Sequence, residues 1–367
     1  MTARAYLDWN ATAPLRSEAR EAVSASLAAC GNPSSVHTAG RAARARIEEA
    51  RDDVAALVGA LPGQVTFTSG GSEANALALS GHRRVLVSAI EHDSVSANAP
   101  EAERIAVTSS GLVDLADLEC RLRASSEPAL VSVMLANNET GVLQPLAEIV
   151  TLARDHGSLV HADAAQAAGR IPVDFHALGL DLMSLSAHKL GGPQGVGALI
   201  AGPRATLNPL IRGGGQERGR RSGTENGPGI AGFGAAAKAA TTDWSAIAGL
   251  RDAFETKLRA LGGEIFAAEA PRLPNTSCLR LPGILAETLV IALDLAGIAV
   301  SAGAACSSGK VRPSPVLRAM GASEEAAREA IRISLGWSTT AEEIAFLTTE
   351  LEKIRDRLAA RTLRAAA

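Results

Sequence analysis

Lys189 is the residue of this sequence whose type and surroundings most favour covalent chemistry. It follows the apolar run Leu182-Met-Ser-Leu185, adjoins His188 and precedes a glycine loop that begins at Gly191. A lysine that is partly removed from water loses its proton more readily, and its neutral amine forms a Schiff base with an aldehyde. Most lysines are solvated, however, so Lys189 taken alone predicts only an exposed loop residue.

A second segment, Thr68-Ser-Gly-Gly-Ser-Glu-Ala-Asn75, is typical of a strand end, a glycine turn and a helix start. The backbone of Gly70 and Gly71 can approach a phosphate closely. The first amides of the helix point at that phosphate, and Ser72 adds a hydroxyl. An ordinary strand-to-helix turn explains this segment equally well by itself.

Two further strand ends carry polar residues. Asp163 ends the apolar run that begins at Val160, where an unpaired carboxylate is costly and a cationic ring nitrogen would satisfy it. His92 follows Glu91 and offers an imidazole face for stacking, although such a histidine alone is more often structural. Together these segments favour the Schiff-base interpretation of Lys189.

These residues are positioned by strands that alternate with helices. Short apolar runs predict strands over 65–68, 85–90, 130–135, 159–162 and 182–185, and helical spacing predicts helices over 41–58, 72–79 and 146–156. The alternation predicts an α/β fold with a mostly parallel, helix-covered sheet.

After about residue 240 the pattern changes. It predicts helices over 244–261 and 286–296, strands over 277–281, 298–301 and 332–335, and a C-terminal helix from near Thr340. The change predicts a second, smaller α/β domain, and we expect a large domain over 13–241 and a small domain formed by residues 1–12 and 242–367.

Composition limits the classes of partner. The chain has 367 residues, of which 47% are hydrophobic, and a formal net charge of −3 from 36 basic and 39 acidic side chains. This balance argues against nucleic acid or an anionic membrane as the main partner. The arginines of the 41–58 helix, Arg41, Arg44, Arg46 and Arg51, alternate with acidic residues, as on a solvated face.

The cysteines and the chain start predict a reducing compartment. Cys30, Cys120, Cys278 and Cys306 form no CxxC pair, and the sequence has no HExxH motif, so we expect neither a disulfide framework nor a metal site. The first residues lack the apolar core of a signal peptide, and no uncharged apolar run is long enough to span a bilayer. We expect a cytoplasmic location.

Ten motifs along the chain resemble, in order, those of the cysteine desulfurases of the class V aminotransferase family. These are pyridoxal-phosphate enzymes with the aspartate aminotransferase fold. The motifs are Tyr-Leu-Asp-Trp-Asn-Ala-Thr-Ala-Pro (6–14), Gly-Asn-Pro-Ser-Ser-Val-His (31–37), Phe-Thr-Ser-Gly-Gly-Ser-Glu (67–73), Glu-His (91–92), Asn-Asn-Glu-Thr-Gly (137–141), Asp-Ala-Ala-Gln (163–166), Ser-Ala-His-Lys (186–189), the glycine- and arginine-rich run 213–226, Ala-Cys-Ser-Ser-Gly (305–309) and Arg-Ile-Ser-Leu-Gly (332–336).

The resemblance implies that the cofactor is pyridoxal 5′-phosphate. Lys189 would hold its aldehyde, and Asp163 would pair with the pyridine nitrogen and keep the ring cationic. Gln166 would face the phenolic oxygen, and His92 would stack on the ring and take part in catalysis.

The resemblance also implies a phosphate cup and a substrate clamp. The cup would comprise Gly71, Ser72, Ser186 and His188, with Thr224 donated across the interface of a homodimer. Asn138 and Arg332 would bind the carboxylate of L-cysteine, and a planar guanidinium suits that bidentate pairing better than a lysine does.

Cys306 decides the reaction. It stands in Ser301-Ala-Gly-Ala-Ala-Cys-Ser-Ser-Gly309, a run of small residues that predicts a mobile loop, and nearby Lys310 and Arg312 favour its thiolate. The usual alternative for a free cysteine is a small buried hydrophobe. That alternative suits Cys278 in its apolar strand, and we extend it to Cys30 and Cys120.

The motif at Cys306 resembles the longer-loop desulfurases, which hand sulfur to scaffold proteins for iron–sulfur clusters. The implied reaction converts L-cysteine to L-alanine and leaves a persulfide on Cys306, for cluster assembly or another sulfur acceptor. An aminotransferase, an amino-acid lyase or a selenocysteine lyase of the same fold remains an alternative. A nucleotide-binding protein is less favoured, because 192–197 is not GxGxxG and 309–310 lacks the P-loop spacing.

Overall fold

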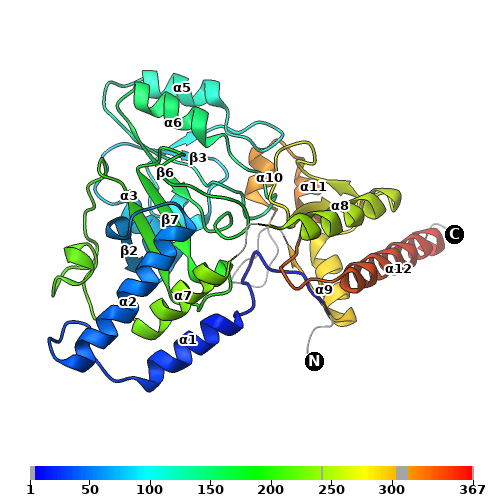
Figure 1. Ribbon diagram of the computed structural model, residues 1–367. Coiled ribbons are helices and arrows are strands. Elements are labelled where there is room, and N and C mark those ends of the chain that lie inside the picture. The colour runs from blue at the N-terminus through cyan, green and yellow to red at the C-terminus, as the bar shows by residue number, and fades with distance from the viewer. Residues whose placement is uncertain (1–4, 241–242, 303–312, 366–367) are drawn as a thin grey trace.

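The computed structural model describes residues 5–240, 243–302 and 313–365. Figure 1 shows a larger part built around a twisted sheet and a smaller part in which α8 (Ser245–Ala260), α9 (Ala286–Ala296) and α12 (Ala341–Ala365) gather. A separate cluster of buried apolar side chains fills each part.

Within the described residues, the larger part contains a seven-stranded sheet in the order β2-β8-β7-β6-β5-β3-β4. In that order the strands span Val65–Thr68, Gly197–Ala201, Leu182–Ser186, Leu159–Asp163, Leu130–Ser132, Val85–Ser88 and Glu103–Ile105. The pairs from β7 through β6, β5 and β3 to β4 are parallel, whereas β8 is antiparallel to both β7 and β2. The prediction of a mostly parallel sheet is therefore confirmed.

Helices cover this sheet. In Figure 1, α1 (Ser17–Ala28), α2 (Thr38–Leu57) and α7 (Gly227–Ala239) lie side by side, and α5 (Leu115–Arg123) contacts α6 (Leu146–Asp155) elsewhere on the large part. Glycine allows the close contact between α7 and α2, because a Cβ at Gly234 would lie 2.5 Å from the Cα of Ala50. The remaining helical elements of the large part are α3 (Gly71–Leu79), α4 (Asp93–Ser96) and the 3-10 turns Pro62–Gln64, Ala187–Lys189 and Gln216–Gly219.

The smaller part takes residues from both ends of the chain. Its sheet has the order β12-β13-β10-β9, which spans Ser301–Ala302, Ile331–Ser334, Thr276–Arg280 and Glu264–Ile265. The N-terminal strand β1 (Ala5–Tyr6) pairs in parallel with β11 (Ile298–Ala299). The short helices α10 (Pro315–Ala319) and α11 (Glu324–Glu329) complete the described elements.

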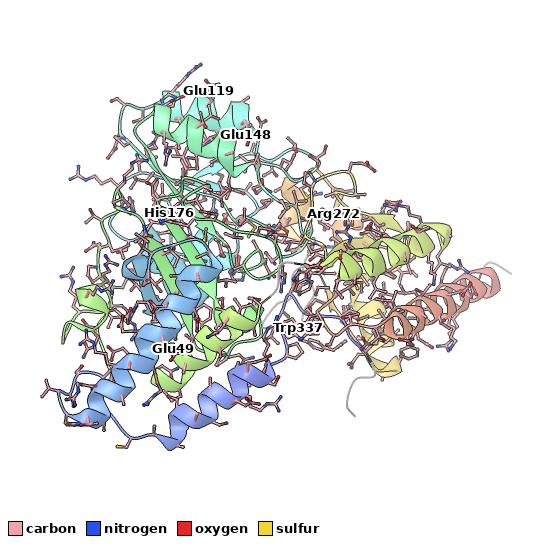
Figure 2. All side chains as sticks on the ribbon, viewed as in Figure 1. Glu49, Glu119, Glu148, His176, Arg272 and Trp337 are labelled. Atoms are coloured by element: carbon pink, nitrogen blue, oxygen red, sulfur yellow. The ribbon has the colours of Figure 1, made fainter. Side chains whose placement is uncertain are left out.

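The two parts meet through aromatic and backbone contacts. The guanidinium of Arg16, next to α1, lies 3.7 Å from the ring centroid of Trp337. Residues Val142 and Arg272 form an isolated antiparallel bridge. Figure 2 labels Trp337 and Arg272, and both lie where the larger and smaller parts adjoin. These contacts hold the smaller part against the larger one.

Sequence periodicity placed most of these elements correctly to within a few residues. Among the elements that it missed are α1, α5, α7 and β8.

Cys30 and Cys120 are exposed, so the expectation that they are buried was wrong; only Cys278 is buried among the described cysteines. Cys120 lies between Leu118 and Leu122, the two buried residues of α5, and the helical turn therefore directs it to the opposite face.

The interpretation of the 41–58 arginines as a solvated face was wrong for Arg51. Its side chain is buried and pairs with Glu217 at 2.8 Å, which also accepts from the backbone nitrogen of Phe67 at 2.9 Å. A buried guanidinium needs such an anion, and Glu217 is remote in sequence.

No helix among the described residues combines the length and apolar character that crossing a membrane requires.

Candidate active site

A cavity of about 870 Å³ lies where the carboxyl ends of the large sheet meet the smaller part. This is the edge at which ligands bind in open α/β sheets. Ten of the predicted site residues line it: Gly71, Ser72, His92, Asn138, Asp163, Gln166, Ser186, His188, Lys189 and Arg332. The fold thus assembles residues from distant parts of the chain around one space.

Lys189 ends the 3-10 turn that follows β7. Its Nζ donates to the backbone oxygens of Asn10 at 2.7 Å and Ala11 at 2.8 Å. The N-terminal segment therefore closes one side of the cavity and orients the amine. Neither of these two oxygens carries a charge that would hold the amine in its protonated form.

The surroundings of Lys189 favour the neutral amine. Burial, together with the positive charges of Arg332 and Arg170, lowers the pKa of Lys189 to about 8. A lysine in water has a pKa about two units higher. Roughly a tenth of the amine is therefore unprotonated at pH 7, far more than for a lysine in water, and this neutral form is the one that attacks an aldehyde.

Asp163 ends β6, the strand that pairs in parallel with β7. Its Oδ2 accepts from Nδ2 of Asn75 at 2.8 Å, and its Oδ1 accepts from the backbone nitrogen of Ala165 at 2.9 Å. The residue is 8% exposed, and no cationic side chain pairs with its carboxylate among the described residues. It can accept a further hydrogen bond from a cationic ligand.

The N-terminus of α3 lies close to the end of β7. A Cβ at Gly71 would lie 3.2 Å from the Cβ of Ser186, so glycine leaves the space in which the two segments adjoin. Burial and the nearby charges of Lys189 and Arg170 lower the pKa of His188 to about 4, and its imidazole is therefore neutral at pH 7. Amides, hydroxyls and a neutral imidazole together form a set of anion-binding groups.

Arg332 lies on β13 and is 5% exposed. Its Nη2 donates to Oδ1 of Asp8 at 2.7 Å, and its Nη1 donates to the backbone oxygen of Asn138 at 3.0 Å. Its Nε is buried and has no hydrogen-bond partner among the described residues. The guanidinium is thus held in one plane at the cavity wall, where it can meet a carboxylate.

The other predicted residues are placed as follows. Gln166 donates from Nε2 to the backbone oxygen of Asn10 at 3.0 Å, and His92 accepts at Nδ1 from the backbone nitrogen of Ser94 at 3.0 Å. Thr224 is exposed and does not line the cavity of the single chain. Cys306 lies outside the described residues.

Several polar residues of the site were not assigned from the sequence. Asp8 lies inside the motif 6–14, and Asn75 follows the motif 67–73. Their contacts are with residues far along the chain, because Asp8 accepts from Arg332 and Asn75 donates to Asp163. Glu91 accepts at Oε1 from the backbone nitrogen of Met134 at 2.7 Å. Burial, with Asp163 nearby, raises the pKa of Glu91 well above its usual value and favours its neutral form.

Comparison with known proteins shows similarity over nearly the whole chain. Residues 5–347 match the family model described as Aminotransferase class-V. A cysteine desulfurase from Cereibacter sphaeroides is 43% identical, with 97% of each chain covered, and the cysteine desulfurase IscS of Dictyoglomus turgidum is 38% identical, with 98% of this chain and 96% of the relative covered. The solved structure of a NifS-like protein from Rickettsia africae has a TM-score of 0.89 at 38% identity, covering 96% of this chain and 99% of that one.

Proposed function

Because the chain belongs to the class V aminotransferase family, we propose that it is a pyridoxal-phosphate-dependent cysteine desulfurase. It converts L-cysteine to L-alanine and receives the sulfur on Cys306 as a persulfide. The observation that carries the proposal is the meeting of an amine of lowered pKa, a buried carboxylate and a guanidinium around one cavity.

The residues of the cavity fit pyridoxal 5′-phosphate. Lys189 would hold the aldehyde, and Asp163 would accept from the protonated pyridine nitrogen, because its carboxylate lacks a cationic partner among the described residues. The cradle between Gly71 and Ser186 would take the phosphate. When bound, the cofactor supplies an electron sink for the pair left on the substrate Cα after its proton is removed.

The residues of the chain perform the remaining steps. Arg332 and Asn138 bind the substrate carboxylate and fix the direction of the Cα–H bond. Nζ of Lys189 accepts the Cα proton. The thiolate of Cys306 then attacks the substrate sulfur: the sulfur–sulfur bond forms, the carbon–sulfur bond breaks and its electron pair stays on Cβ. Cβ takes up the proton that the substrate thiol releases, the proton held by Lys189 returns to Cα, and alanine leaves.

The lowered pKa of Lys189 predicts the pH at which the cofactor-free protein captures pyridoxal phosphate. The rate of capture depends on the neutral amine and is expected to rise with pH around a midpoint near 8. Replacement of Arg332 by glutamine removes a positive charge and should move that midpoint upward. Borohydride trapping at a series of pH values measures it, and a midpoint unchanged in R332Q would contradict the electrostatic cause.

The partners and the domain division are also part of the proposal. A homodimer would bring the exposed Thr224 of one subunit to the phosphate of the other. The sulfur acceptor would be an iron–sulfur scaffold or another acceptor protein, in the cytoplasm. Residues 13–241 would form the cofactor-binding domain, and 1–12 with 242–367 the small domain, as the two apolar clusters support.

The proposed function is tested by incubating the purified protein, loaded with pyridoxal phosphate, with L-cysteine. L-alanine should form, and mass spectrometry should locate a persulfide on Cys306 before any acceptor is added. A keto acid in place of alanine would indicate an aminotransferase or a lyase. Alanine formed from L-selenocysteine but not from L-cysteine would indicate a selenocysteine lyase.

A further inference from the structure

Arg170 is a buried cation that takes no direct part in the proposed reaction. It is 3% exposed, and no acidic side chain pairs with it among the described residues. Burial and the charge of Arg332 lower its pKa to about 9, so the guanidinium stays charged near neutral pH. A buried charge without a counter-ion is costly, because protein dipoles alone replace the water that it has lost. The hydrogen bonds of Arg170 must therefore offset a large desolvation cost.

Three segments of the chain meet on this guanidinium. Its Nη1 donates to the backbone oxygen of Gln166 at 2.9 Å and also to Oε1 of the same residue. Its Nη2 donates to the backbone oxygens of Trp9 at 3.3 Å and Lys189 at 3.1 Å. One side chain thus holds together the N-terminal segment, the turn after β6 and the 3-10 turn after β7. A guanidinium suits this position, since its donors lie in one plane.

These contacts decide which way the Gln166 amide faces. Oε1 accepts from Arg170, and Nε2 donates to the backbone oxygen of Asn10 at 3.0 Å. The reverse orientation would bring the amide hydrogens against the guanidinium and the amide oxygen against a carbonyl oxygen, so both contacts would become repulsive. Gln166 lines the cavity, and its Nε2 keeps one hydrogen that neither contact uses. The amide can therefore offer an N–H donor to an anionic oxygen in the cavity.

The charge of Arg170 also acts on the amine of Lys189. Burial, Arg332 and Arg170 lower the pKa of that amine, and Asp163 and Asp8 act in the opposite direction. The hydrogen bond from Arg170 to the backbone oxygen of Lys189 fixes the guanidinium beside the turn that carries the amine. A cation held there destabilises the protonated amine without forming a bond to its nitrogen.

We propose that Arg170 is a positioning residue for cofactor attachment: it turns an N–H of Gln166 toward the cavity and holds a positive charge beside the turn of Lys189. The inference rests on the proposed function, in which Lys189 takes the aldehyde of pyridoxal phosphate. The N–H stabilises the phenolic oxygen of the ring as an anion, and the charge favours the neutral amine. Arg170 thereby acts on the reaction without touching the substrate.

The charge is tested by comparing Arg170→Gln with Arg170→Lys in cofactor-free protein, with borohydride trapping of pyridoxal phosphate at a series of pH values. Loss of the charge in Arg170→Gln should raise the midpoint of attachment by about half a pH unit to one unit. The rise should be smaller than in R332Q, because Arg332 acts on the amine more strongly. Arg170→Lys keeps the charge and should keep the wild-type midpoint. His188 has a pKa of about 4 and does not titrate in this range.

Arg84→Gln is the matched control for these variants. The Arg84 side chain is 10% exposed and also donates to backbone oxygens, those of Glu127 at 3.1 Å and Arg121 at 2.7 Å. It does not line the cavity. Its replacement should lower the temperature of unfolding and leave the midpoint of attachment unchanged.

The amide is tested by the pH at which the bound cofactor changes colour in the loaded protein. A donor to the phenolic oxygen makes that oxygen a weaker acceptor, so the linkage to the lysine gives up its proton at lower pH. Gln166→Ala removes the donor and should raise the pH of the colour change. Arg170→Gln should raise it as well, but by less in the Gln166→Ala background than in wild type, because part of its effect passes through the amide.

An unchanged midpoint in Arg170→Gln, or an equal rise in Arg170→Lys, would overturn the role of the charge. Strictly additive shifts in the Gln166 cycle would overturn the role of the amide. If Arg170→Gln does not fold, Arg170→Met, which is also neutral, takes its place, and an unmoved colour change in Gln166→Ala would by itself overturn the role of the amide. Wild-type protein in which pyridoxal phosphate does not attach to Lys189 would instead overturn the proposed function.

Discussion

Replacement of Lys189 by alanine is expected to abolish the borohydride-fixable attachment of pyridoxal phosphate and to reduce alanine formation roughly 10²- to 10⁴-fold, the contribution of a positioned acid–base group. Lys189 is the lysine that lines the cavity among the described residues, so no neighbouring amine there can take its place. Absorbance of the bound cofactor, borohydride trapping and an alanine assay measure the two losses.

The matched control is Lys238→Ala. Lys238 lies in the last turn of α7 and does not line the cavity. Its replacement should leave both cofactor attachment and turnover unchanged. If the Lys189 variant still yielded a borohydride-fixed cofactor at another lysine and kept its turnover, the assignment of Lys189 would be wrong.

Replacement of Cys306 by serine is expected to leave the cofactor colour unchanged and to abolish persulfide formation and sulfide release from L-cysteine. A serine hydroxyl is not ionised near neutral pH and is a poor nucleophile toward sulfur, whereas a thiolate is a good one. The change leaves Lys189 and Asp163, the proposed cofactor-binding residues, untouched. Absorbance measures the bound cofactor, and an assay with added thiol measures the sulfide released from L-cysteine.

The other cysteines provide the controls for this experiment. Cys120→Ser removes an exposed thiol, and Cys278→Ser removes a buried thiol whose pKa burial raises. Neither change should affect sulfide release in folded protein. Unchanged release in the Cys306 variant, with loss in one of the others, would transfer the acceptor role to that cysteine.

The strand ends made much of the site predictable from the sequence. Asp163 and Lys189 each follow an apolar run, and the carboxyl ends of parallel strands meet at one edge of a sheet. Their placement around a single cavity agrees with that expectation. The family and the fold class, inferred from ten short motifs, are confirmed by the match over residues 5–347.

Contacts between remote segments were not predictable in the same way. The Arg332–Asp8 and Arg51–Glu217 pairs join residues that no local period relates, and each depends on how the elements pack. Helix α7 was missed because its glycines and alanines lack the polar–apolar contrast that periodicity requires. Strand β8 follows a glycine loop and turns antiparallel, which alternation of strands and helices does not predict.

The pairing of β1 with β11 has a consequence for biosynthesis. The first strand emerges from the ribosome long before its partner, and the carbonyls of Asn10 and Ala11 can reach Lys189 in their final positions only after the C-terminal third has been made. Domains that depend on such distant pairings fold slowly. The catalytic pocket is therefore expected to mature after translation ends, with the larger sheet as an earlier intermediate.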